Sequence, residues 1–131
     1  MKHLVFVYGT LKKGNPIRGL DKFNGSTFIG EATTIDSDFM MLDLGAFPGV
    51  IFAKNWINAT KISGEVFSVT TDVIMKLDII EGYPDFYDRS EVETTKGKAW
   101  MYHLASLQYA KSYSEPTENV IINNGVSYWI G

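Results

Sequence analysis

Apolar positions recur at helical spacing in one segment of the chain and at strand-like spacing in most of the others. The helical segment is Thr71–Glu81, where Thr70 or Thr71 can cap the start and Gly82 can end the helix. At about 100° per residue, Lys76 faces water. The opposite arc is apolar and is expected to face the core; it consists of Val73, Ile74, Leu77 and Ile80.

Short runs of β-branched and aromatic residues predict strands in most of the remaining chain. In chain order these runs lie around Leu4–Tyr8, Thr27–Thr33, Phe39–Leu42, Val50–Ala53, Lys61–Val69, Arg89–Thr95 and Ala99–Leu104. A last strand is expected within Val120–Trp129, with a turn at Asn124-Gly125. Lys96-Gly97-Lys98 is typical of a hairpin turn.

A second helix is predicted between the first two strands. Asn15-Pro16 supplies a cap and a first helical position, and Asn24-Gly25 stops the helix after about Phe23, although Gly19 disfavours it. Many short strands with a few short helices indicate the α+β class. We therefore expect residues 1–131 to form one domain, built on a small closed or nearly closed mixed β-barrel with two or three short helices.

Glu81 closes the predicted Thr71–Glu81 helix on its apolar side. A carboxyl group among core-facing residues has its charged form disfavoured, so its pKa rises toward neutrality. Such a group is suited to proton transfer at working pH. The alternative is that Glu81 lies at a frayed helix end, bends into solvent and has no role. Helix geometry leaves both interpretations open.

Composition excludes several classes of function. Twelve basic and fifteen acidic residues give a net charge of −3 without a block of like charge, so a nucleic-acid partner is not expected. No apolar run is long enough to span a membrane, and Met1–Val5 leads directly into a strand, so neither a membrane partner nor a secretory signal is expected. The absence of cysteine rules out thiol catalysis and disulfides, and it fits a cytoplasmic protein.

The segment Tyr8-Gly9-Thr10-Leu11 follows the first strand, and such a turn exposes backbone N–H groups that bind small anions. Lys12 and Lys13 give it some likeness to a phosphate-binding loop. The P-loop spacing is missing, however, which argues against nucleotide binding. An ordinary strand-to-loop turn remains the alternative.

Other chemistries find no support in the sequence. His3 and His103 belong to no metal-type cluster, and no Gly-x-Ser-x-Gly nucleophile elbow occurs. No metal and no cofactor are therefore expected. A single buried acid, Glu81, remains as the candidate for chemistry, and it suits a reaction that needs only proton transfer and positioning.

Four motifs occur in a characteristic order: Tyr8-Gly9-Thr10-Leu11-x-x-Gly14, Phe47-Pro48-Gly49, Gly64-Glu65-Val66-Phe67 and Leu77-Asp78-x-x-Glu81-Gly82-Tyr83-Pro84-x-x-Tyr87-x-Arg89. Together they resemble the γ-glutamylcyclotransferase-like family, most closely its small γ-glutamylamine cyclotransferase branch. The resemblance runs from about Leu4 to Leu104. The family tends to end in Gly-x-Trp, whereas Gly125 and Trp129 are four positions apart here, so a role of the tail in the pocket is not carried over.

The resemblance implies a pocket between the Tyr-Gly-Thr-Leu segment and the glutamate at the helix end. The α-amine of a γ-glutamyl substrate would attack its own γ-carbonyl, giving 5-oxoproline and a free amine. Glu81 would be the general acid and base. The N–H groups of Gly9, Thr10 and Leu11 would hold the α-carboxylate or the oxyanion. Tyr8 and Tyr87 would line the substrate site.

Two other functions stay open at this stage: a binding module that kept the pocket without turnover, and removal of a γ-glutamyl protecting group from a biosynthetic intermediate. Several residues have simpler expected roles. Arg89 is expected to pair with Asp85 or Asp88, and Glu65 to point outward or pair with a basic neighbour. Asp43 and Asp78 are expected to be solvated. Phe47-Pro48-Gly49 is either a rigid turn or a lip of the pocket.

Overall fold

The computed structural model describes residues 1–16, 18–106 and 117–131 and contains a curled β-sheet, a separate hairpin and one α-helix. This architecture confirms the predicted α+β class. In chain order the elements are β1 (Lys2–Val7), the 3₁₀ turn η1 (Leu20–Lys22), β2 (Ser26–Thr33), β3 (Phe39–Asp43), β4 (Pro48–Phe52), β5 (Lys61–Thr70), α1 (Thr71–Ile80), β6 (Tyr87–Thr94), β7 (Gly97–Leu104), β8 (Val120–Asn123) and β9 (Val126–Trp129).

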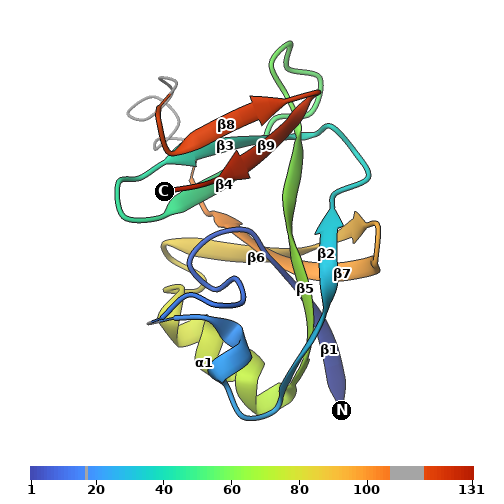
Figure 1. Cartoon of the computed structure of the whole chain (residues 1–131), viewed down its shortest axis with the longest axis vertical. Coiled ribbons are helices and arrows are strands. Elements are labelled where there is room, and N and C mark those ends of the chain that lie inside the picture. The colour runs from blue at the N-terminus through green and yellow to red at the C-terminus, as the bar shows by residue number, and fades with distance from the viewer. Residues whose placement is uncertain (17, 107–116) are drawn as a thin grey trace.

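Seven strands form the main sheet in the order β6-β7-β1-β5-β9-β8, and β2 also pairs with β5. The sheet curls into a half-barrel, in place of the closed or nearly closed barrel expected. Its edges meet at one bridge, Thr34 with Thr94, where the Thr95 amide donates to the Thr33 carbonyl at 3.0 Å. The long strand β5 runs through the molecule, with α1 near one end and the β8–β9 hairpin near the other (Figure 1).

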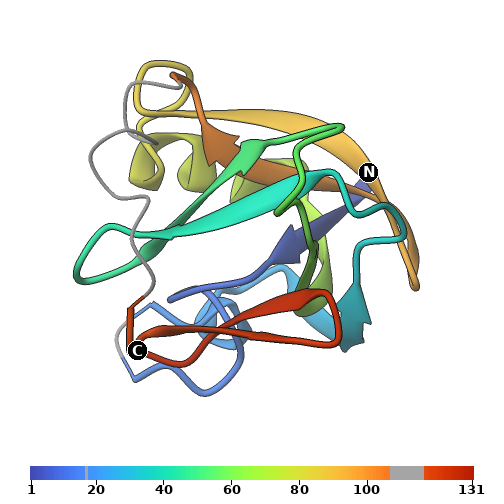
Figure 2. The ribbon, with the colours of Figure 1, turned by 90° about the horizontal axis from the view of Figure 1, so that it is seen from above.

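The β3–β4 hairpin forms a second, two-stranded sheet. Seen from above, it crosses the molecule between β6–β7 on one side and β8–β9 on the other (Figure 2), and it contacts both pairs of strands. This hairpin brings Pro48, the first residue of β4, close to the end of β1.

The second half of β1, Val5–Val7, is buried on both faces because the sheet there is covered on both sides. Val5 and Val7 pack in the same apolar cluster as Val73 of α1, whereas Phe6 and Tyr8 pack in a second cluster inside the half-barrel. A strand buried on both faces reads as a continuous apolar run, as this one does in the sequence.

Helix α1 confirms most of the periodicity prediction. Thr70 is the N-cap, and Val73, Ile74 and Leu77 are buried, while Lys76 is exposed. Ile80 was expected in the core, but it is 41% exposed because it lies at the rim of a cavity.

The predicted helix from Asn15 to about Phe23 is wrong. Among the described residues of this segment, the only helical element is the 3₁₀ turn η1, and Gly19 before it has extended backbone angles (φ −52°, ψ 129°). The Leu20 amide donates to the Leu11 carbonyl at 2.8 Å, which ties this segment back onto the preceding loop. A helix starting at Asn15 cannot make that hydrogen bond.

The C-terminal prediction is confirmed in part. The turn at Asn124-Gly125 is present, but the segment forms two strands, β8 and β9, where one was expected. Both turn residues have positive φ angles (52° and 76°), as a tight hairpin turn requires. Within the part of the chain described here, no helix has the length and apolar character needed to span a membrane.

Candidate active site

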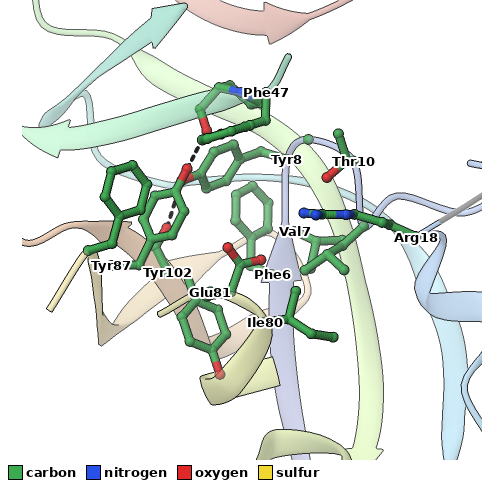
Figure 3. Close-up of a pocket in the computed structure, with 14 residues that line it drawn as sticks. Phe6, Val7, Tyr8, Thr10, Arg18, Phe47, Ile80, Glu81, Tyr87 and Tyr102 are labelled. Carbon is green, nitrogen blue, oxygen red and sulfur yellow. Dashed lines mark hydrogen bonds between the residues drawn. The ribbon is translucent and has the colours of Figure 1, made fainter. Parts of the chain in front are cut away.

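A cavity of about 200 Å³ lies between the end of β1 and the end of α1. Figure 3 shows the Glu81 carboxyl group pointing into it from the helix end, with Arg18 reaching in from the side of Thr10. The lining residues are Phe6, Val7, Tyr8, Gly9, Thr10, Leu11, Arg18, Phe47, Pro48, Ile80, Glu81, Phe86, Tyr87 and Tyr102.

All six residues named from the sequence as site residues lie on this one cavity: Tyr8, Gly9, Thr10, Leu11, Glu81 and Tyr87. Sequence reasoning missed Arg18 and Tyr102. Arg18 was missed because residues 15–23 were predicted to form a helix. The described part of the segment folds as a loop with one 3₁₀ turn, and this fold places the Arg18 side chain at the cavity. Tyr102 lies on β7, where alternation alone does not distinguish a core residue from a cavity residue.

The end of α1 fixes the position of Glu81. Gly82 has a positive φ of 65°, its amide donates to the Ile79 carbonyl at 3.2 Å, and the Tyr83 amide donates to the Asp78 carbonyl at 2.9 Å. This pair of bonds is the Schellman arrangement that ends helices. Glu81 is therefore held as the C-cap residue of a well-defined turn, and the frayed helix end considered from the sequence is wrong.

Glu81 was expected to be largely buried, and the residue as a whole keeps some exposure. Burial nevertheless raises its pKa from 4.5 to about 7, against a smaller opposing effect of the Arg18 cation. A carboxyl group with this pKa exchanges protons readily near neutral pH. Glu81 is the only acidic residue among the described residues that line the cavity.

Residues 8–14 form a segment that we call the β1 loop, and its first four residues line the opposite wall of the cavity. The Lys12 amide donates to the Gly9 carbonyl at 3.1 Å, and from outside the cavity Glu65 accepts from the Lys13 amide at 2.7 Å. Glu65 thus bonds to the backbone of Lys13 and not to its ammonium group. The N–H groups of Gly9, Thr10 and Leu11, called the loop amides below, donate to no residue that the structure describes. They are available to an anion.

Gly9 is required by close packing. A Cβ atom at this position would lie 2.7 Å from the ring of Pro48, which itself lines the cavity. Because Phe47 and Pro48 both line the cavity, the Phe47-Pro48-Gly49 motif is a lip of the pocket, and it leads into strand β4 instead of forming a turn.

Two tyrosines line the cavity, and the hydroxyl group of each donates its proton to a backbone carbonyl. Tyr8 donates to the Tyr102 carbonyl and Tyr87 to the Pro48 carbonyl, each at 2.7 Å. Burial raises the pKa of both phenols, and the nearby Glu81 raises them further, so both stay neutral. A hydroxyl group has one proton and two lone pairs, so each oxygen can still accept a hydrogen bond.

Asp78 lies one helical turn before Glu81 and is not solvated as expected. Its Oδ1 accepts from Arg89 Nε at 2.9 Å and from the Tyr102 hydroxyl at 2.6 Å. The Arg89 guanidinium also lies 4.8 Å from the ring centre of Tyr83 and 4.7 Å from that of Trp100. Arg89 therefore pairs with Asp78 and not with Asp85 or Asp88.

Asp43, also expected to be solvated, accepts hydrogen bonds from the Gly45 amide at 2.7 Å and from Asn119 at 2.9 Å. Hydrogen bonds from Thr117 and these partners lower its pKa. Over residues 1–16, 18–106 and 117–131, no group of three His, Cys, Asp or Glu side chains is placed to hold a metal ion.

Comparisons with known proteins agree with this geometry. The family model “Gamma-glutamyl cyclotransferase, AIG2-like” matches residues 5–121. A Vibrio cholerae protein with the provisional name of gamma-glutamylcyclotransferase is 36% identical over 102 residues, which are 78% of this chain and 82% of that protein. The rat gamma-glutamylaminecyclotransferase is 32% identical over 100 residues, which are 68% of this chain and 61% of the rat protein.

Solved structures give the same result. An AIG2-like protein from Mus musculus has a TM-score of 0.63 and 26% identity, with 79% of this chain and 78% of that chain covered. An uncharacterized protein from Pyrococcus horikoshii has a TM-score of 0.62 and 28% identity, with 79% of each chain covered. The chain therefore belongs to the gamma-glutamyl cyclotransferase, AIG2-like family and is a γ-glutamylcyclotransferase-type enzyme.

Proposed function

We propose that the protein cyclises the γ-glutamyl group of a γ-glutamyl amine or peptide and releases 5-oxoproline and a free amine, with Glu81 as the general acid and base. The observation that carries this proposal is a carboxyl group with a pKa of about 7 on the same cavity as Gly9, Thr10 and Leu11, whose N–H groups donate to no residue that the structure describes. The nucleophile belongs to the substrate, so the protein has to supply only orientation and proton transfer.

In this reaction Glu81 first takes a proton from the α-ammonium group of the substrate. The freed amine attacks the γ-carbonyl carbon, a C–N bond forms, and negative charge develops on the carbonyl oxygen. Glu81 then returns its proton to the departing nitrogen as the amide bond breaks. The α-ammonium nitrogen starts with three protons and keeps one in the ring of 5-oxoproline. Its first lost proton goes to Glu81 and its second goes to water. The free amine takes up one proton from water and leaves as an ammonium ion. No water is consumed.

The acceptor-only tyrosines support a place for the α-ammonium group. The oxygens of Tyr8 and Tyr87 have given their protons to backbone carbonyls, so toward the cavity they offer lone pairs. An ammonium group between these oxygens and Glu81 meets three acceptors. The loop amides supply the matching donors for the α-carboxylate or the oxyanion.

The test is incubation of the protein with a panel of γ-glutamyl amines and γ-glutamyl dipeptides, followed by an assay for 5-oxoproline. The proposal predicts 5-oxoproline and free amine in equal amounts from at least one member. Tight binding of panel members without 5-oxoproline would contradict it, and so would release of free glutamate, because hydrolysis needs water in place of the α-amine.

A further inference from the structure

Three basic residues lie close together in the sequence near the cavity: Lys12, Lys13 and Arg18. Two of them are engaged elsewhere. The Lys12 ammonium group donates to the Trp129 carbonyl at 3.2 Å, and that of Lys13 lies 4.7 Å from the ring centre of Phe28. Of these three, only Arg18 lines the cavity.

The Arg18 guanidinium makes no ion pair or hydrogen bond with a residue that the structure describes. Its charge lies close enough to Glu81 to oppose the effect of burial on that carboxyl group. Figure 3 shows its end directed into the cavity beside Thr10. An unpaired guanidinium at the edge of a cavity is a binding group for a carboxylate.

The position of Arg18 indicates which carboxylate it meets. Tyr8, Leu11 and Tyr87 are buried at the inner part of the cavity, together with the loop amides that are assigned to the γ-glutamyl group. Arg18 is exposed, so it lies toward solvent. The amine that leaves must pass on the solvent side, and a carboxylate on that amine comes within reach of the guanidinium.

We propose that Arg18 is a specificity-determining residue, an inference that rests on the proposed function. It selects γ-glutamyl substrates whose leaving amine carries a carboxylate, as in γ-glutamyl amino acids. Simple γ-glutamyl amines, and above all those with a cationic leaving amine, are poorer substrates. The guanidinium binds the carboxylate of the leaving group in the ground state and in the transition state alike, so its main effect is on KM.

The test compares two compounds that differ by one charge: γ-glutamyl-alanine and its C-terminal amide. The wild-type protein is expected to prefer the acid by about tenfold in kcat/KM. This is the effect of one charge-assisted hydrogen bond, reduced because Arg18 is exposed to solvent. At a pH well above the pKa of Glu81, where that carboxyl group is ionised with or without Arg18, Arg18→Met should lower kcat/KM for the acid by about tenfold and change it less than twofold for the amide. Lys13→Met removes the same charge from a residue off the cavity and should keep the preference.

Two results would overturn this inference: an equal loss on both compounds in Arg18→Met, which would assign the guanidinium to the α-carboxylate they share, or no change on either. Circular dichroism checks that each variant is folded. If the wild-type protein turns over neither compound, the wider panel described above decides the proposed function separately. The same comparison is then made with the dissociation constants of the two compounds, measured by NMR titration, and it decides the role of Arg18 independently of turnover.

Discussion

At the residue scale, burial and the charge of Arg18 have opposite effects on the pKa of the Glu81 carboxyl group. Partial burial at the end of α1 raises its pKa to about 7, and the Arg18 cation lowers it to a smaller extent. The neutral tyrosines Tyr8 and Tyr87 add dipoles but no charge to the same cavity. Glu81 is therefore able to change protonation state near neutral pH, as a group that takes and returns a proton must.

This pKa has a consequence for stability. The folded-state pKa of Glu81, about 7, lies above its ordinary value of 4.5, so the folded protein holds the proton more tightly than the unfolded chain does. The resulting stabilisation is fully present below about pH 4.5 and is lost as pH rises through 7. Glu81→Gln removes this dependence. Relative to the variant, the wild type should therefore lose about 2 kcal/mol of unfolding free energy between pH 5 and pH 8.

Urea unfolding of both proteins at pH 5, 6, 7 and 8 measures this difference. The variant serves as the control for all other titrating groups, because those are shared. Parallel curves of unfolding free energy against pH would contradict a raised pKa at Glu81.

At the element scale, the last turn of α1 is held by contacts from β6 and β7. Arg89 of β6 and Tyr102 of β7 both donate to Asp78, which precedes Glu81 by three residues on the same helix. Tyr83, just after the helix, stacks against the same guanidinium. This network fixes the helix end relative to the sheet, and with it the place of the Glu81 carboxyl group.

Replacement of Arg89 by Met should destabilise the protein by about 1.5–3 kcal/mol, because it removes charged hydrogen bonds from a partly buried carboxylate. The matched control is Lys98→Met, which breaks an exposed ion pair with Glu93 at 3.8 Å and should cost less than about 0.5 kcal/mol. Thermal and denaturant unfolding of the two variants gives the comparison. Equal losses would mean that the Asp78 network does not hold the helix end.

Elements whose signals are local could be predicted from the sequence. Helix α1 has its cap at Thr70 and its stop at Gly82 within the segment itself, and β1 reads as a buried strand without reference to its partners. These local signals made Glu81 and the Gly9–Leu11 segment candidates, and the family resemblance then joined them with Tyr8 and Tyr87 in one predicted site. The pairing of Arg89 with Asp78 depends on how β6 packs against α1, which no spacing along the chain encodes.

At the scale of the whole molecule, the cavity forms where β1 ends along β5. The pairing of β1 with β5 stops at Val7 with Glu65, and β9 pairs with the first residues of β5, Lys61 and Ile62. The β1 loop leaves the sheet between these two pairings. The predicted helix after this loop was wrong because Leu20 bonds back to Leu11, a contact made only in the folded molecule.

This arrangement predicts where the product binds. On titration with 5-oxoproline, the largest amide chemical-shift changes should be at Gly9, Thr10 and Leu11, because their N–H groups are the free donors on the cavity wall. Raising the salt concentration from 50 to 500 mM should change the affinity little. Changes centred on Lys12 and Lys13 that vanish at high salt would instead indicate a surface contact and contradict the assignment.

The most direct test of the account is the turnover of Glu81→Gln beside that of the wild type, with 5-oxoproline as the measured product. The substitution keeps the shape of the side chain and removes its ability to accept and return a proton. We predict a folded variant that still binds substrate and whose kcat is lower by roughly 10²–10⁴-fold. Wild-type activity should rise with pH through about 7, the pKa of Glu81. A folded Glu81→Gln protein with near-wild-type turnover would contradict the account.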